Sequence, residues 1–197
     1  MTASLSSAFR PADILYQQPV AAFAAWLSRL PESAEASAGA GLQEEQASAI
    51  ASRLLLLPIS SRRAVLSAMM DDAVWSTLAP SEESRRRFLA LSSRALQEAL
   101  SKAPLDGAMW LAAAKLRTLQ EGFDRTAETF LRRSYVLAPR EAMVAADRLA
   151  FAGLIRPLAR ENIDSEFQRD SDIVCQTRPK RYRALKEFLA LPDCNRS

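Results

Sequence analysis

Apolar residues recur three and four positions apart along most of the chain, and prolines or glycines separate the runs. This spacing places apolar side chains on one face of an α-helix. The alternation that is typical of strands is not sustained over more than a few residues. The pattern therefore predicts an all-α protein, with helices at about 19–31, 43–57, 61–80, 81–103, 106–122, 124–138, 139–153 and 180–191, and one more near 158–167.

The centre of the chain carries clear helix boundaries. Asp106 and Asp124 are suited to begin helices, because a carboxylate there accepts hydrogen bonds from free backbone N–H groups. Leu105 and Trp110 have the spacing of a hydrophobic staple. Gly122 suits a helix end, where a left-handed backbone conformation is common. These signals predict a helical hairpin.

A repeat is suggested by an Ala-Pro pair at 103–104 that returns at 138–139, 35 residues later, which is close to the period of paired-helix repeats. Between the pairs, the stretch resembles the tetratricopeptide repeat (TPR) family at positions that pack its two helices and close its turns: Trp110, Gly122, Ala127, Leu131 and Pro139. The resemblance covers about 85–150. It implies antiparallel helix hairpins stacked as a short TPR-like α-solenoid, with atypical capping helices at its ends.

Composition and pattern divide the chain into three parts. Residues 1–41 are expected to form an N-terminal helix and a flexible linker, because 31–41 is small, polar and contains glycine. Residues 42–155 are expected to form the TPR-like domain. Residues 156–197 are expected to form a C-terminal helical extension that contains a basic segment.

The resemblance also implies a concave groove, lined by the first helix of each pair, that holds a peptide or a helix of a partner protein. The residues expected to face this groove are Ala108, Leu111, Lys115 and Thr118, joined by Arg148 from the next helix. Lys115 and Arg148 would pair with carboxylates of the partner. The alternative is that both are ordinary solvated charges.

The segment 178–186 offers a second kind of contact. The chain as a whole is nearly balanced, with a net charge of +3. Within this segment, however, basic residues surround Tyr182, and they could neutralise phosphates while the ring stacks on a base, or could contact an anionic membrane surface or an acidic partner. We expect a protein partner and no nucleic acid, because the overall charge is low. The basic residues of this second candidate are Arg178, Lys180, Arg181, Arg183 and Lys186.

Catalytic chemistry has no recognisable signature in the sequence. Histidine is absent, no serine lies in a G-x-S-x-G turn, and there is no glycine-rich phosphate loop. We therefore expect a non-enzymatic protein with no catalytic residue, no metal and no cofactor. An enzyme whose site is assembled from distant residues stays open as an alternative.

The compartment is not fixed by the sequence. Cys175 and Cys194 are either independent thiols or a disulfide formed in an oxidising compartment. No signal or membrane-spanning run is recognisable, which favours the cytoplasm. An Arg-Arg-Ser-Tyr run before the second Ala-Pro pair also resembles bacterial proteins of cell-envelope or exopolysaccharide machinery. Some of these proteins are membrane-tethered. The resemblance therefore implies a periplasmic, membrane-associated location if an anchor precedes this sequence. Peripheral contact with a membrane is the other possibility.

Overall fold

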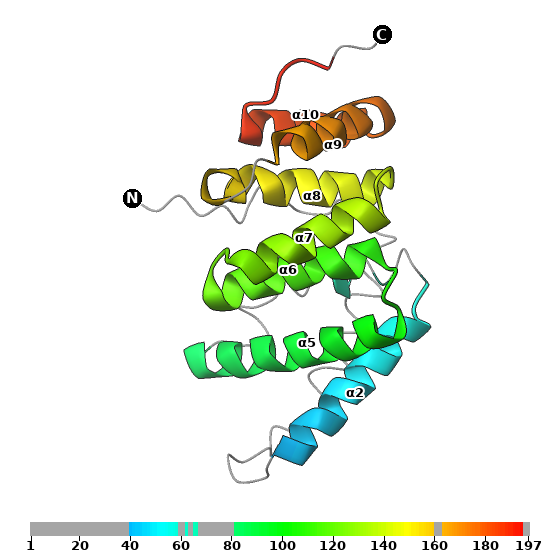
Figure 1. Cartoon of the computed structure of the whole chain (residues 1–197), viewed down its shortest axis with the longest axis vertical. Coiled ribbons are helices and arrows are strands. Elements are labelled where there is room, and N and C mark those ends of the chain that lie inside the picture. Colours follow the sequence, from blue (N-terminus) through cyan, green and yellow to red (C-terminus); the bar gives the residue numbers. More distant parts are fainter. Residues whose placement is uncertain (1–39, 59–61, 63–64, 67–80, 160–162, 195–197) are drawn as a thin grey trace. The chain divides into compact units, whose positions relative to one another are not determined.

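The computed structural model describes residues 40–58, 62, 65–66, 81–159 and 163–194 (Figure 1). These residues form helices and connecting turns, with no strand among them, so the all-α prediction is confirmed. The chain divides into two compact units, unit 1 (1–104) and unit 2 (105–197). Their boundary falls inside the 42–155 segment that was expected to form one domain. The helix predicted at 19–31 lies outside the described residues.

Unit 1 contains helices α2 (Ala40–Leu56) and α5 (Glu82–Lys102), which pack against each other. Helix α2 begins earlier than predicted, so the last two residues assigned to the linker are helical. The continuous apolar run 54–57 suggests burial on more than one side of the helix, but Leu56 is 84% exposed. The three- and four-residue spacing predicts one apolar face for α2, and its residues are buried: Ala47, Ile50, Ala51 and Leu54. Val65 and Leu66 are buried as well.

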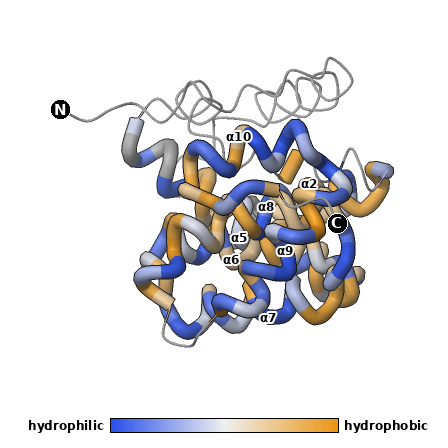
Figure 2. The backbone as a smooth tube through the Cα atoms, turned by 90° about the horizontal axis from the view of Figure 1, so that it is seen from above, coloured by the Kyte–Doolittle hydropathy of each residue, from blue (hydrophilic) through white to orange (hydrophobic). Residues whose placement is uncertain are grey.

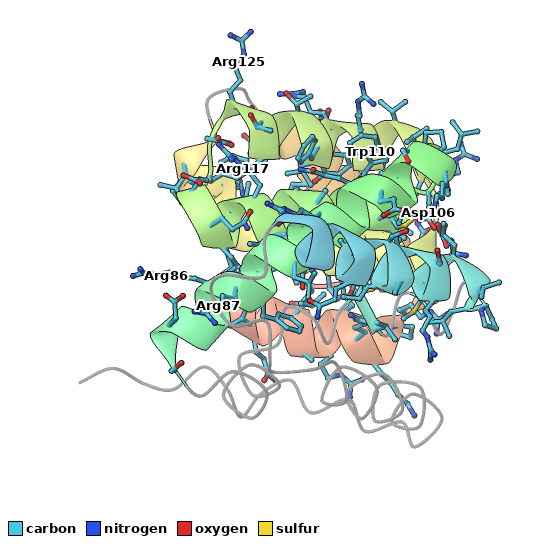
Figure 3. All side chains as sticks on the ribbon, turned by 90° about the horizontal axis from the view of Figure 1, so that it is seen from below. Arg86, Arg87, Asp106, Trp110, Arg117 and Arg125 are labelled. Carbon is cyan, nitrogen blue, oxygen red and sulfur yellow. A yellow bond between two sulfur atoms is a disulfide. The ribbon has the colours of Figure 1, made fainter. Side chains whose placement is uncertain are left out.

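The spacing of α5 predicts an apolar face of Phe88, Ser92, Ala95, Leu96 and Ala99. The last four are buried, and Phe88 is half-buried. The start of α5 is basic and exposed, and Arg86 and Arg87 project from it (Figure 3). Arg87 forms an ion pair with Glu83 one turn earlier. A run of basic residues of this kind is either a solvated helix face or a contact for an acidic partner, and the exposure of Arg86 and Arg87 fits a solvated face.

Unit 2 contains five α-helices and a short 3-10 turn in its described part: α6 (Gly107–Glu121), α7 (Arg125–Leu137), α8 (Ala142–Ile155), η2 (Arg156–Leu158), α9 (Asp164–Thr177) and α10 (Pro179–Leu189). Helix α6 packs on α7, and α8 packs on α9. Helix α8 also contacts α6 and α10, so it lies between the pair α6–α7 and the pair α9–α10 (Figure 1). Hydrophilic and hydrophobic stretches alternate along these helices, as amphipathic packing requires (Figure 2).

The predicted boundaries of α6 and α7 are confirmed. The Asp106 carboxylate accepts hydrogen bonds from two backbone N–H groups of α6, and Asp124 accepts one from Ala127. Gly122 ends α6 with a φ of 78°. The predicted staple is not formed in full, because Leu105 is 78% exposed.

Two later boundaries differ from the prediction. Helix α8 continues through Gly153 to Ile155, and Leu189 of α10 packs where a side chain at Gly153 would lie. Helix α9 continues through the polar stretch 168–172, which had been expected to follow a helix. The reason is that Asp170 and Ser171 face the interior, where both are buried.

Candidate functional site

Arg148, which was expected to face a partner, lies inside unit 2 and is 0% exposed. Its guanidinium forms two hydrogen bonds with the Asp170 carboxylate on α9, at 2.8 and 2.7 Å. Its Nη1 donates to the backbone oxygens of Ser134 and Ala138 on α7, both at 2.9 Å. The Tyr135 ring lies 4.6 Å from the guanidinium carbon. The prediction that Arg148 contacts a partner is therefore wrong, because groups of this chain occupy its donors.

The Arg148 cluster joins three helices. Arg148 of α8 donates to two carbonyl groups at the end of α7: that of Ser134, which also accepts the Ala138 N–H, and that of Ala138, just after the helix. Asp170 of α9 balances its charge. Burial raises the pKa of Asp170, and the hydrogen bonds from Arg148 oppose that rise. The cluster is thus a part of the fold and not a binding surface.

Lys115 lies on a different surface, which is formed by α6, α8 and α10. Its amine lies 6.0 Å from the centroid of the Phe151 ring. Asp147 and Arg181 are near enough to affect its ionisation, and these two residues form an ion pair with each other. We call the set of Lys115, Thr118, Asp147, Phe151 and Arg181 the Lys115 face.

The Lys115 face carries one more cation than anions. Asp147 is occupied by Arg181, whereas Lys115 forms no hydrogen bond or ion pair with any described residue. Burial lowers the pKa of Lys115, the Asp147 carboxylate opposes this shift, and Arg181 adds to it. A half-buried ammonium group without a counter-ion is suited to bind an anionic group, because such binding restores the interactions lost on desolvation.

The other three residues expected in the groove contribute less. Ala108 is half-buried and packs against the apolar core of unit 2. Leu111 is 4% exposed, so it underlies the surface and is not itself available to a partner. Thr118 is half-buried, and its hydroxyl donates to the backbone oxygen of Ala114 at 2.8 Å. Of the expected groove residues, Lys115 therefore offers the most to a ligand.

Apolar side chains extend the Lys115 face toward the C-terminal ends of α6 and α8. Leu119 follows Lys115 by four residues and Leu154 follows Phe151 by three, so each lies about one turn further along its helix. These leucines are 45% and 57% exposed. The Phe123 ring packs edge-on against Phe151, with centroids 6.3 Å apart. A charged site thus adjoins an apolar one.

The basic residues of 178–186 fall into two groups, those in ion pairs with this chain and those exposed to solvent. Arg181 and Lys186 form ion pairs with Asp147 and Asp193. Tyr182 is 3% exposed, so its ring is not available to stack on a base. The remaining cations are exposed and form no ion pair with a described residue: Arg178, Lys180 and Arg183.

Sequence reasoning missed the partners of both charged clusters. Asp147 and Phe151 are separated by four residues in α8, which is the spacing of one helix face. Asp170 likewise shares a face with Phe167 and Val174 of α9. A charged residue on an otherwise apolar face is the available signal in both helices. For Asp170 this signal is visible only once the polar stretch 168–172 is placed in a helix.

Within the described part of the chain, no group of three or more acidic or cysteine side chains is placed to hold a metal ion. None of the helices described there is long and apolar enough to cross a membrane. Comparison of the chain with protein families, curated proteins and solved structures finds no significant match.

Proposed function

We propose that this protein is a non-enzymatic interaction module with TPR-like helix pairs, and that the Lys115 face binds a peptide or a helix of a partner protein. The observation that carries the proposal is the Lys115 ammonium, which is half-buried and has no counter-ion among the described residues. The neighbouring carboxylate of Asp147 is occupied by Arg181. A carboxylate of the partner would supply the missing negative charge.

The exposed leucines next to the Lys115 face indicate what the ligand carries beside its acidic residue. Leu119 and Leu154 expose apolar surface one turn from the charged site. A ligand helix that places an acidic residue and an apolar residue about one turn apart would satisfy both regions. The preferred ligand is therefore an amphipathic, acidic segment.

A binding role agrees better with this chemistry than catalysis does. A lysine with a lowered pKa can act as a base or nucleophile, but such a role needs a second group to move a proton. Asp147 is committed to Arg181, and the Thr118 hydroxyl is committed to the backbone of its own helix. The charges at this site are arranged to hold an anion.

Selection from a random peptide library displayed on phage would test the proposal. Selection on the wild-type protein should enrich peptides with Asp or Glu about one helical turn from an apolar residue. Lys115→Glu should weaken their binding at least about tenfold, since a charge-assisted hydrogen bond contributes about 1.5–3 kcal/mol. Arg183→Glu is the matched control, because it makes the same charge change at an exposed site on α10. Equal binding by Lys115→Glu and the wild type would contradict the proposal.

We place the module in bacterial cell-envelope or exopolysaccharide machinery, in an oxidising compartment. The support is the resemblance of the Arg-Arg-Ser-Tyr run to proteins of that kind, together with the disulfide between Cys175 and Cys194. Structural disulfides persist in oxidising compartments and are rare in the cytosol.

A second candidate function is contact with an anionic membrane surface. It is favoured by the exposed cations Arg178, Lys180 and Arg183, which form no ion pair with a described residue. At about 1 kcal/mol for each basic residue near the surface, the three would supply only about 3 kcal/mol, so this contact would assist another anchor. Co-sedimentation with phosphatidylserine vesicles at low salt tests it. Loss of binding in the triple alanine variant is expected, and binding to single-stranded DNA in preference to vesicles would contradict it.

A further inference from the structure

The chain reverses direction after α10. Ala190 has a left-handed backbone conformation, with φ 51° and ψ 43°, which is unfavourable for a residue other than glycine. The Leu191 N–H then donates to the Lys186 carbonyl oxygen at 3.2 Å. Leu191 is 6% exposed and belongs to the apolar core of unit 2. The reversal therefore needs contacts from elsewhere to hold it.

Side chains of α9 and α10 supply those contacts. The Tyr182 hydroxyl donates to the Pro192 carbonyl oxygen at 3.0 Å and accepts a hydrogen bond from Ser171 at 3.3 Å. Lys186 pairs with Asp193, which is largely exposed. The covalent contact is the disulfide between Cys175 of α9 and Cys194, whose Cα atoms are 5.6 Å apart.

These contacts differ in strength and in what breaks them. The Lys186–Asp193 pair is solvent-exposed, and pairs of that kind contribute little to stability. A single hydroxyl-to-carbonyl hydrogen bond is also a modest contribution. The disulfide closes a loop with a sequence separation of 19, which restricts the open chain far more than either polar contact. Of these three contacts, the disulfide therefore restrains residues 190–194 the most, and it adds to the burial of Leu191.

We propose that residues 190–194 form a redox-controlled clip that holds α10 on α9 and α8. When the disulfide is intact, Leu191 belongs to the same apolar core as Tyr182 and Leu185, and Pro192 accepts a hydrogen bond from Tyr182. A dithiol reductant opens it: the S–S bond accepts two electrons and two protons to give two thiols, while the reductant becomes a disulfide. Opening frees the reversal at Ala190 and loosens α10. The clip acts on the fold itself and needs no bound partner.

Hydrogen exchange of the full chain, followed by mass spectrometry, tests the clip. Reduction with dithiothreitol followed by alkylation should make the amides of α10 exchange about tenfold faster or more, since local opening governs their exchange. The amides of α6 and α7 should keep their protection. Cys194→Ser should show the same pattern without reductant. Asp193→Asn, which removes the ion pair and keeps the disulfide, should leave α10 protected.

Three results would overturn the clip. The first is unchanged exchange in α10 after reduction. The second is equal acceleration across all of unit 2, which would make the disulfide a general staple. The third is the detection of two free thiols in protein extracted from its native compartment under acid trapping, because the closed form would then not exist there.

Discussion

Arg148 places a positive charge in the interior of unit 2, where desolvation of an ion costs several kcal/mol. The Asp170 carboxylate and two backbone oxygens offset that cost through four hydrogen bonds of 2.7 to 2.9 Å. The pair is therefore stable only while both charges are present. Removal of one partner would leave the other buried without a counter-ion.

Arg148→Met should lower the free energy of unfolding by about 3–5 kcal/mol, measured by urea denaturation followed by circular dichroism. The double variant Arg148→Met, Asp170→Leu should recover a large part of this loss, because neither charge is then unpaired. Arg183→Met, at an exposed site, is the control and should change stability by less than about 0.5 kcal/mol. A loss for Arg148→Met as small as that of the control would be inconsistent with the buried pair.

Two buried tyrosines differ in their hydroxyl groups. The Tyr135 hydroxyl has no hydrogen-bond partner among the described residues, and burial raises its pKa. The Tyr182 hydroxyl has two partners, Ser171 and Pro192. Tyr135→Phe should therefore leave the free energy of unfolding unchanged or raise it by about 1 kcal/mol, whereas Tyr182→Phe should lower it by about 1 kcal/mol. Thermal denaturation of both variants measures the difference in stability. A larger loss for Tyr135→Phe than for Tyr182→Phe would contradict the assignment of hydrogen-bond partners to Tyr182 and none to Tyr135.

At the scale of the helices, close packing at two glycines fixes how neighbouring elements meet. A Cβ atom at Gly107, the first residue of α6, would lie 2.6 Å from the Ala138 Cβ and 3.0 Å from the Ala138 backbone nitrogen. No side-chain rotation can move either of these atoms away. A Cβ atom at Gly153 in α8 would instead meet the end of the Leu189 side chain, which can change its rotamer. The two glycines therefore face neighbours of different rigidity.

Gly107→Ala should lower the free energy of unfolding by about 1–3 kcal/mol, although alanine is by itself the better helix former. Gly153→Ala should cost less, because Leu189 can move. Urea denaturation of the two variants side by side makes the comparison. A larger loss for Gly153→Ala would mean that α10 is held on α8 more rigidly than the end of α7 is held on α6.

At the scale of the whole molecule, the all-α class and most of the described helices could be predicted from sequence. Caps such as Asp106 and Asp124 act within one helical turn, so their signal is local and readable. The division into units at 104 and 105 was not predicted, because it depends on contacts between distant segments.

The candidate site was predicted only in part, for the same reason. Lys115 was identified, but Arg148 was assigned to the wrong environment. Whether an arginine on a helix is solvated or buried depends on a carboxylate far along the chain, here Asp170, 22 residues later. Likewise, the counter-ion of Asp147 is Arg181 on another helix. Local spacing can place a charged residue on an apolar face, but it does not identify the distant residue with which that charge pairs.

The most direct test of the account is chemical-shift mapping of the isotope-labelled full chain during titration with a selected acidic peptide. We expect the perturbed resonances to cluster on α6, α8 and α10, around Lys115, Phe151 and Arg181, and α5 to be unaffected. Lys115→Glu should abolish these changes, whereas Arg183→Glu should preserve them. Perturbations centred on α5, or perturbations that persist in Lys115→Glu, would contradict the assignment of the Lys115 face as the binding surface.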